Sequence, residues 1–196
     1  MAKVLIATLY GPDPILVAAN KLGPDRMVLL IDSEPSKMQT DSLELIKSSL
    51  GRVIDVKTVK TAVYDIVDVA RKAVEVIDMQ PKDDEIYVNI TSGRKTKAIG
   101  LLFAAYARYS HVKKIMYFPE EKGSSVVYLP KLQFQLNESQ KRVLEYMEKG
   151  GFSSLMELSE TIDISRAMLY RNIRELEEMG LVEELKLTDA GKIARL

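Results

Sequence analysis

The stretch VNITSGRKTKAIGLL, residues 88–102, decides how the rest of the chain is interpreted. It begins as an apolar run typical of a buried strand, turns at Ser92 and Gly93, and continues as an apolar helix. Three cations, Arg94, Lys95 and Lys97, stand in the first turn of that helix. A cation at a helix N-terminus opposes the helix dipole by about 0.3–1 kcal/mol. The cluster is therefore either a solvated first turn or a site for a negatively charged ligand.

Strand-like runs alternate with helical patterns through the first 130 residues. The predicted strands cover residues 3–9, 26–32, 53–59, 85–91, 113–118 and 125–130. Helical patterns separate the first five strands, which indicates parallel βαβ crossovers and helices on both faces of one sheet. The turn PEEKGS joins the last two strands and predicts an antiparallel edge. The predicted fold class is therefore α/β, with a Rossmann-like, six-stranded and mainly parallel sheet.

The pattern changes after residue 131, where three short helical segments follow one another. They cover residues 137–150, 153–162 and 165–180, and they precede the short run LVEELKL and a final turn of helix. Helix, helix, tight turn, helix and short strand is the order of a winged helix-turn-helix. We therefore expect an α/β domain at 1–131 and a small winged helix-turn-helix domain at 136–196. The apolar linker LPKLQFQLN, residues 129–137, is expected to pack and to transmit motion between them.

Composition excludes several kinds of site. The chain has no cysteine and one histidine, so disulfides, thiolate chemistry and multi-histidine metal sites are excluded, and no metal or cofactor is expected. No run approaches the roughly 18 apolar residues of a membrane span. The first residues are too short and too strand-like for a signal peptide, so a cytoplasmic location is expected.

The net charge of zero hides a small asymmetry between the two predicted domains. Residues 1–135 carry 19 Lys or Arg and 16 Asp or Glu, a balance of +3, and residues 136–196 carry 9 and 12, a balance of −3. Neither part is a general polyanion binder, so any contact with nucleic acid must be local.

Two predicted loops converge at one edge of such a sheet. In a doubly wound sheet, ligands bind in the crevice at the carboxyl ends of the first and fourth strands, where the strand order reverses. The loops there are residues 8–14 and 89–97, and both contain glycine and lead into helix N-termini that favour anions. Asp13 is the expected N-cap of the first helix, with Pro14 in its first turn. Neither the P-loop pattern nor the dinucleotide fingerprint is present, so a nucleotide would bind in another manner.

With the winged helix that follows it, the segment NITSGRKTK resembles a known family, the CARF–winged-helix regulators of archaeal CRISPR antiviral systems. In that family the segment after the fourth strand reads Asp/Asn-x-Thr-Gly/Ser-Gly-x-Lys/Arg, and the loop after the first strand forms the other wall of the site. The resemblance implies a homodimer that binds a cyclic oligoadenylate, usually the tetra-adenylate, and regulates transcription of CRISPR-Cas genes. The ligand-binding residues that the resemblance implies are Leu9, Tyr10, Gly11, Asp13, Asn89, Thr91, Ser92, Gly93, Arg94 and Lys95, and the basic cluster adds Lys97 as a candidate.

The apolar pattern of the helix that follows the basic cluster is independent support for a dimer. KAIGLLFAAYARY, residues 97–109, is apolar nearly all round, so one face can cover the sheet while the other needs a second partner. A two-fold interface through this helix would gather both copies of Arg94 and Lys95 around one axis. Ordinary packing within one subunit explains the segment equally well.

The segment ISRAMLYRNIRELEEMG, residues 164–180, is the candidate recognition helix. We expect Ala167, Leu169, Ile173 and Leu176 to pack inward. The side chains left to contact double-stranded promoter DNA are Ser165, Arg166, Tyr170, Arg171 and Arg174. The domain is acidic and its short wing leaves almost no hairpin, so a protein-interaction role remains an alternative.

Three functions stay open at this point. A ligand-responsive DNA-binding regulator is the leading hypothesis. A ring nuclease that opens the cyclic ligand needs little beyond geometry and a cation such as Lys95, so enzymatic activity is left open. A winged-helix regulator that senses another metabolite, outside CRISPR, is the third hypothesis.

Overall fold

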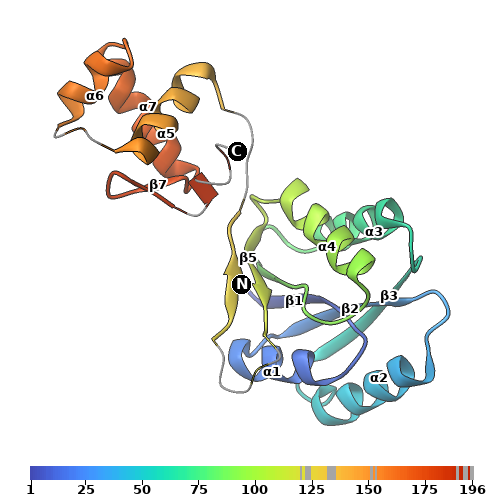
Figure 1. Cartoon of the computed structure of the whole chain (residues 1–196). Helices are drawn as coiled ribbons and strands as arrows, with labels where there is room; N and C mark the ends of the chain where they lie inside the picture. Colours follow the sequence, from blue (N-terminus) through green and yellow to red (C-terminus); the bar gives the residue numbers. More distant parts are fainter. Residues whose placement is uncertain are drawn as a thin grey trace. The chain divides into compact units, whose positions relative to one another are not determined.

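The computed structural model describes residues 1–119, 121, 125–131, 136–150, 152, 154–188, 190–191 and 194. The chain divides into two compact units, Met1–Leu129 and Pro130–Leu196. Figure 1 shows a sheet flanked by helices in the first unit and a group of short helices in the second. The linker residues 132–135 and part of the expected final helix lie outside the described residues, so the prediction that the linker packs stays a prediction.

The first unit is built on one six-stranded sheet. Its strands are β1 (Lys3–Thr8), β2 (Arg26–Asp32), β3 (Asp55–Thr61), β4 (Glu85–Asn89), β5 (Val112–Tyr117) and β6 (Val127–Leu129), in the order β3-β2-β1-β4-β5-β6. The first five strands are parallel, and β6 is antiparallel to β5. The predicted α/β fold class is confirmed, and the strand order reverses between β1 and β4.

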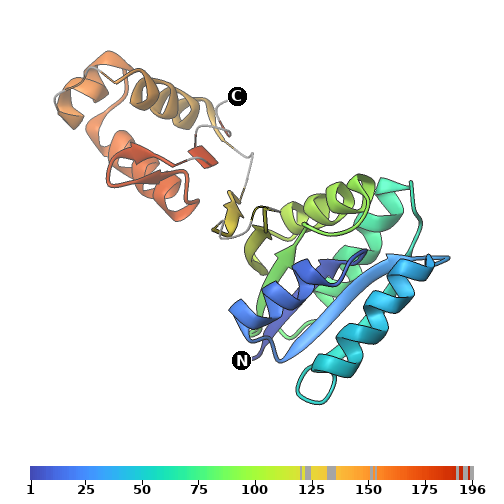
Figure 2. The same ribbon diagram turned by 60° about the horizontal axis from the view of Figure 1, so that its bottom comes forward.

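Two pairs of helices cover the two faces of this sheet. The helices are α1 (Asp13–Leu22), α2 (Lys37–Leu50), α3 (Ile66–Asp78) and α4 (Lys95–Ala107). Helices α1 and α2 lie on one face and α3 and α4 on the other, as Figures 1 and 2 show. Alternate residues of β1 explain this arrangement, because Leu5 and Ala7 belong to the cluster on the α1 side while Val4 and Ile6 belong to the cluster on the α3 side.

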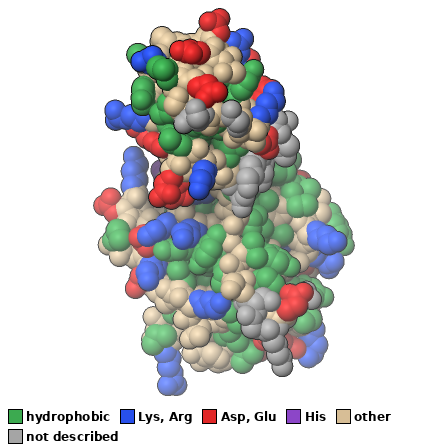
Figure 3. All heavy atoms as spheres, turned by 60° about the vertical axis from the view of Figure 1, so that its left-hand side comes forward, with side chains coloured by type: hydrophobic (Ala, Val, Ile, Leu, Met, Phe, Trp, Pro, Cys, Tyr) green, Lys and Arg blue, Asp and Glu red, His purple; other side chains and the backbone are tan. Residues whose placement is uncertain are grey.

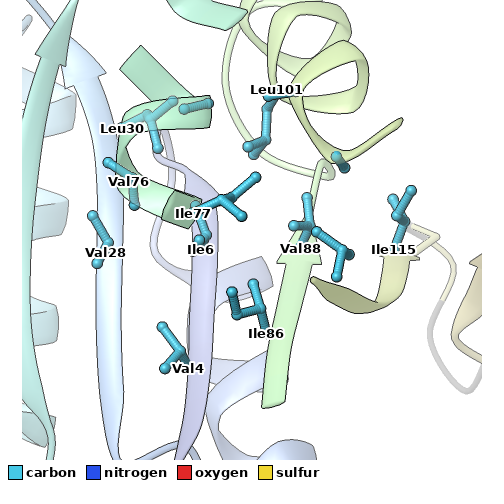
Figure 4. Close-up of a cluster of buried hydrophobic side chains, with 14 of the residues drawn as sticks. Val4, Ile6, Val28, Leu30, Val76, Ile77, Ile86, Val88, Leu101 and Ile115 are labelled. Carbon is cyan, nitrogen blue, oxygen red and sulfur yellow. The ribbon is translucent and has the colours of Figure 1, made fainter. Parts of the chain in front are cut away.

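The cluster between the sheet and α3–α4 is the core beneath the candidate site. In Figure 4, side chains of β1, β2, β4 and β5 converge on Val76 and Ile77 of α3 and on Leu101 of α4. Leu101 is fully buried, and burying a leucine side chain stabilises a fold by about 1.5–3 kcal/mol. This packing holds the start of α4 against the carboxyl edge of the sheet.

Helix α4 is apolar on both faces but is buried on only one. Its buried residues are Lys97, Gly100, Leu101, Ala104 and Ala105, whereas Ile99 and Phe103 are exposed in the single chain. Gly100 allows close approach of α3, because a Cβ built on it would lie 2.7 Å from the Cβ of Val69.

The helix starts in the first unit differ in how they are capped. Ser36 and Asp65 accept backbone N–H groups and cap α2 and α3. The prediction that Asp13 caps α1 is wrong: Pro12 occupies the N-cap position and Asp13 is the first helical residue. Arg94 occupies the N-cap position of α4 and makes no side-chain capping bond, so the N-terminus of α4 has no capping side chain.

The second unit contains α5 (Glu138–Lys149), α6 (Leu155–Thr161) and α7 (Arg166–Glu178), followed by β7 (Val182–Glu183) and β8 (Lys186–Leu187). Its core gathers leucine, valine and isoleucine side chains from all three helices and from β7. Asn137 and Gln140 form a capping box at the start of α5. The predicted winged helix-turn-helix order is confirmed.

The wing is the feature that the sequence pattern underestimated. Strands β7 and β8 pair antiparallel around a two-residue turn, Glu184-Leu185, and both residues have positive φ angles of 48° and 62°. Two successive positive φ values are typical of the tight type I′ hairpin turn, which asparagine and glycine usually occupy. The expectation that LVEELKL forms almost no hairpin is therefore corrected: a short hairpin forms without the usual turn residues.

Candidate functional site

The loops that follow β1 and β4 are held together at the carboxyl edge of the sheet. The Thr8 hydroxyl donates to the backbone oxygen of Ser92, and the backbone N–H of Tyr10 donates to the Ser92 hydroxyl at 2.8 Å. The side-chain amide of Asn89 donates to the backbone oxygen of Pro14 at 3.3 Å. The two segments singled out from the sequence are therefore direct neighbours.

Asn89 and Thr91 fix the path of the second loop. The Asn89 side-chain oxygen accepts from the backbone N–H and the hydroxyl of Thr91, at 3.0 and 2.6 Å. The Thr91 hydroxyl oxygen accepts from the backbone N–H of Phe118 at 2.8 Å. Asn89 is fully buried and Ser92 nearly so. In this structure the polar side chains of the motif bind the protein's own backbone and shape the loop.

Gly93 is required by the loop's conformation and by its surroundings. Its φ angle is +92°, and a Cβ placed on it would lie 3.0 Å from the Cβ of Thr8. A larger residue there would be strained and would push the β4–α4 loop away from β1. Because Gly93 has no side chain, a ligand can come into close contact with its backbone.

The three cations of the opening stretch have three different environments. Lys95 is exposed and, within the described part of the chain, forms no ion pair or hydrogen bond. The Arg94 side chain is 41% exposed. Lys97 is fully buried, and its Nζ atom lies 2.7 Å from Oδ1 of Asp32. The prediction that all three cations face a ligand is thus corrected for Lys97, whose ammonium group is not at the surface.

Asp32, the last residue of β2, carries the negative charge at the base of the cluster. Its side chain is 3% exposed, and its Oδ2 atom lies 3.7 Å from Nε of Arg94. Its backbone N–H donates to the side chain of Gln39, which is itself buried at the start of α2. Burial lowers the pKa of the Lys97 ammonium, and contact with Asp32 opposes that shift.

Arg94 is also in contact with an aromatic residue that the sequence pattern did not single out. Its Nη1 atom donates to the hydroxyl of Tyr64 at 3.2 Å, and its guanidinium lies 5.5 Å from the centre of the Tyr64 ring. Tyr64 precedes α3 and is 73% exposed. The Thr96 hydroxyl, which donates to the backbone oxygen of Val63 at 2.7 Å, ties this segment to the start of α4.

Side chains of α2 hold the β1–α1 loop by its carbonyl groups. The Gln39 amide donates to the backbone oxygen of Leu9 at 2.6 Å, and the Ser42 hydroxyl donates to that of Tyr10 at 3.0 Å. The side chain of Leu9 is fully buried in the core, so its predicted direct contact with a ligand is corrected: Leu9 anchors the loop.

The predicted residues of this loop that remain accessible are Tyr10, Gly11 and Asp13, of which Tyr10 and Asp13 are exposed. Tyr10 and Gly11 are bonded to Ser92, which lies in the same loop as Gly93, Arg94 and Lys95 at the N-terminus of α4. The first N–H groups of a helix have no partner within it and favour an anion. The arrangement can therefore bind a phosphate group between backbone N–H groups and two exposed cations.

Asp32 and Tyr64 were not predicted from the sequence as site residues, although their positions at the ends of strands could have indicated them. Asp32 ends β2 and Tyr64 follows β3, so both belong to the same carboxyl edge as the two predicted loops. The sequence alone shows which residues follow strands, but not that α4 would turn Lys97 inward onto Asp32.

In the second unit, α7 presents most of the predicted DNA-binding side chains. Arg166, Tyr170, Arg171 and Arg174 are exposed, whereas Ser165 is the N-cap and accepts the backbone N–H of Met168. Leu169, Ile173 and Leu176 are buried as expected, but the expected inward position of Ala167 is wrong: it is exposed. Buried Asn172 donates to Ser139 instead, which joins α7 to α5.

Two of the arginines already have carboxylate partners on the same helix. Arg171 pairs with Glu175 at 2.8 Å and Arg174 pairs with Glu178 at 3.0 Å. Exposed pairs of this kind contribute about 0.3–0.5 kcal/mol, so a phosphate can replace the glutamate. On the face drawn in Figure 3, basic and acidic side chains are interspersed among apolar ones. This face therefore offers DNA no broad positive surface.

Comparison with protein families assigns both units. The family model described as HFX_2341_N:-like, N-terminal, matches residues 4–122, which is more than half of the chain. The model described as winged helix-turn-helix DNA-binding, HTH_24, matches residues 136–183. No curated protein matches the chain.

Two solved structures illustrate the fold. Can2 from Sulfobacillus thermosulfidooxidans in complex with cyclic tetra-adenylate is 17% identical, with a TM-score of 0.53 over 64% of this chain and 33% of that chain. Enterococcus italicus Csm6 bound to cyclic hexa-2′-fluoro-hexa-dAMP is 13% identical, with a TM-score of 0.57 over 93% of this chain and 56% of that chain. The chain thus spans about a third of the first structure and just over half of the second, and the likeness concerns the fold. Among the described helices, none combines the length and apolarity needed to cross a bilayer.

Proposed function

The chain belongs to the HFX_2341_N:-like, N-terminal, family, and we propose that it is a cyclic-oligoadenylate-responsive regulator whose winged helix binds promoter DNA. The resemblance to the CARF–winged-helix regulators is confirmed at the level of domain architecture. The observation that carries the proposal is the N-terminus of α4. It lies where the strand order reverses and has no capping side chain, and Arg94 and Lys95 are exposed beside it.

A phosphodiester is the ligand class that this site fits best. Each phosphate of a cyclic oligoadenylate carries one negative charge, which free N–H groups at a helix N-terminus and arginine both bind. Exposed Tyr10 and Tyr64 offer aromatic faces on which adenine bases can stack, an interaction of about 1–3 kcal/mol per base. The two structural neighbours are bound to a cyclic adenylate of four units and to a 2′-fluoro analogue of six units, and we propose the tetra-adenylate for this chain.

We further propose that two copies of the chain form the complete site. The exposed Ile99 and Phe103 give α4 an apolar outer face, which a second copy can cover. An interface through this face gathers both copies of Arg94 and Lys95 around one two-fold axis, and a cyclic ligand has the symmetry to occupy that axis. Regulation of CRISPR-Cas genes by the winged helix completes the proposal.

The proposed function is tested by measuring how cyclic tetra-adenylate and DNA change each other's affinity for the protein. Cyclic tetra-adenylate is titrated into the full chain with and without a DNA duplex enriched by the protein from a random pool. If the ligand prefers one arrangement of the dimer, it must alter DNA affinity by the same factor that DNA alters ligand affinity. We expect a factor of about 5–150, the usual range of such coupling.

Equal affinities in both titrations would contradict the regulatory proposal. A protein that binds another metabolite but neither cyclic tetra- nor hexa-adenylate would support the alternative sensor outside CRISPR. The same samples, analysed for linear oligoadenylates after incubation, test the ring nuclease. A cation such as the exposed Lys95 ammonium favours this second activity, because it can stabilise the charge that develops on a phosphate.

The winged helix gives a separate prediction. Replacing Arg166 and Arg171 by alanine is expected to weaken DNA binding about 10-fold or more, because each arginine contact with a base or phosphate contributes about 1–3 kcal/mol. Binding at two salt concentrations measures the change, and the slope against salt should become shallower. Arg142→Ala on α5 is the matched control. Wild-type DNA affinity in the double variant would support a protein-interaction role for this unit.

A further inference from the structure

The Asp32–Lys97 pair is not explained by stability. Both side chains are almost completely buried, and the two charged atoms lie 2.7 Å apart in a contact whose angles fall outside those of a hydrogen bond. Replacing a buried ion pair by apolar residues of similar volume is often neutral or stabilising. A buried ion pair is weak evidence for stability, and this pair lies next to Arg94 of the candidate site, so we consider a functional role for it.

The position of Arg94 indicates this role. Its Nε atom is 3.7 Å from Oδ2 of Asp32, which is beyond hydrogen-bond distance, and its only side-chain hydrogen bond among the described residues goes to the exposed Tyr64. Apart from Lys97, Arg94 is the one cation that forms an ion pair with Asp32 within the described part of the chain. A shift of about 1 Å would turn this contact into a charge-assisted hydrogen bond.

Removal of Lys97 would favour that shift. A buried carboxylate without a partner is strongly destabilised, and guanidinium groups bind carboxylates through two parallel hydrogen bonds. Arg94 would then be held at the base of the cluster and would no longer be free for a phosphate. Lys97 prevents this by neutralising Asp32 from the interior side.

We propose that Lys97 is a positioning residue that occupies the buried Asp32 carboxylate and thereby leaves the Arg94 guanidinium free for an anionic ligand. Of the two tests, only the one that measures affinity for cyclic tetra-adenylate rests on the proposed function. It assigns a role to the one cation of the opening stretch that does not face solvent, and it makes Asp32 the residue on which that role depends.

The first test uses no ligand. The native full chain is treated with phenylglyoxal, and the labelling of Arg94 is measured by mass spectrometry relative to exposed Arg52. We expect Lys97→Met to slow labelling of Arg94 by at least about fivefold, because a guanidinium held in a charge-assisted hydrogen bond is less available to the reagent. The double variant Asp32→Asn with Lys97→Met should restore the wild-type rate, and Lys113→Met, which removes a lysine from another carboxylate pair, should leave it unchanged.

The second readout is affinity for cyclic tetra-adenylate in the same variants. We expect a loss of about 10-fold in Lys97→Met and recovery in the double variant. Unchanged labelling in Lys97→Met, or a double variant that labels as slowly as the single one, would overturn the proposal. If Lys97→Met does not fold, Lys97→Gln removes the charge while keeping a hydrogen-bond donor for Asp32, and the same outcomes decide. A wild type that binds no cyclic oligoadenylate would refute the proposed function, whereas the labelling result would still decide the role of Lys97.

Discussion

Replacing Arg94 and Lys95 together by alanine is expected to abolish binding of cyclic tetra-adenylate, with a loss of affinity of at least about 100-fold. Hydrogen bonds to charged groups are worth about 1.5–3 kcal/mol each, so the loss of two contacts amounts to 3 kcal/mol or more. Both side chains are exposed, so their removal leaves the core untouched. Isothermal titration of the full chain measures the affinity, and the melting temperature verifies that the fold is unchanged.

The matched control removes two cations away from this edge of the sheet. Arg52 precedes β3 and Lys57 lies in the first half of that strand, so Arg52→Ala with Lys57→Ala changes the net charge by the same amount. If charge alone attracted the ligand, both double variants would lose affinity equally. An affinity of Arg94→Ala/Lys95→Ala within about threefold of wild type would exclude the α4 N-terminus as the phosphate site, since such a change is below 1 kcal/mol.

The sequence predicted the sheet well because its signals are local. Alternating strands and helices, together with the turn before β6, were enough to predict the parallel order and the antiparallel edge that the structure confirms. The wing was missed for the opposite reason. Glu184 and Leu185 adopt a turn that such residues rarely occupy, and residue preferences cannot reveal a turn that the surrounding packing imposes.

The sequence predicted where the candidate site lies but not which of its cations are exposed and which is buried. The motif correctly indicated which loops meet, because the carboxyl ends of β1 and β4 are adjacent in this topology. Helical spacing alone did not separate Lys95, which is exposed, from Lys97, which is buried. That difference arises from the packing of α4 on α3 and from Asp32, which precedes Arg94 in the sequence by 62 residues and is brought near it only by the fold.

The second large effect concerns the contact between α3 and α4. Replacing Gly100 by leucine is expected to lower the free energy of unfolding of the first unit by about 3 kcal/mol, at the upper end of the usual cost of overpacking. Even the Cβ atom would lie 2.7 Å from the Cβ of Val69 and 3.0 Å from the backbone oxygen of Ile66, so α3 itself must move. The gain of about 0.8 kcal/mol in helix propensity when glycine is replaced does not offset this cost.

The same variant tests how the packing of α3 and α4 supports the site. Tyr64 and Val63 precede α3 and are bound to Arg94 and Thr96 at the start of α4, so a displacement of α3 should separate these contacts and weaken ligand binding. Hydrogen exchange locates the loss of protection, which we expect in α3 and α4 and not in α5–α7. Ser48→Leu, at an exposed position of α2, is the control and should change stability by less than about 0.5 kcal/mol. If Gly100→Leu were as stable as this control, the close approach of the two helices would not hold, and the placement of Arg94 beside Tyr64 would lose its structural basis.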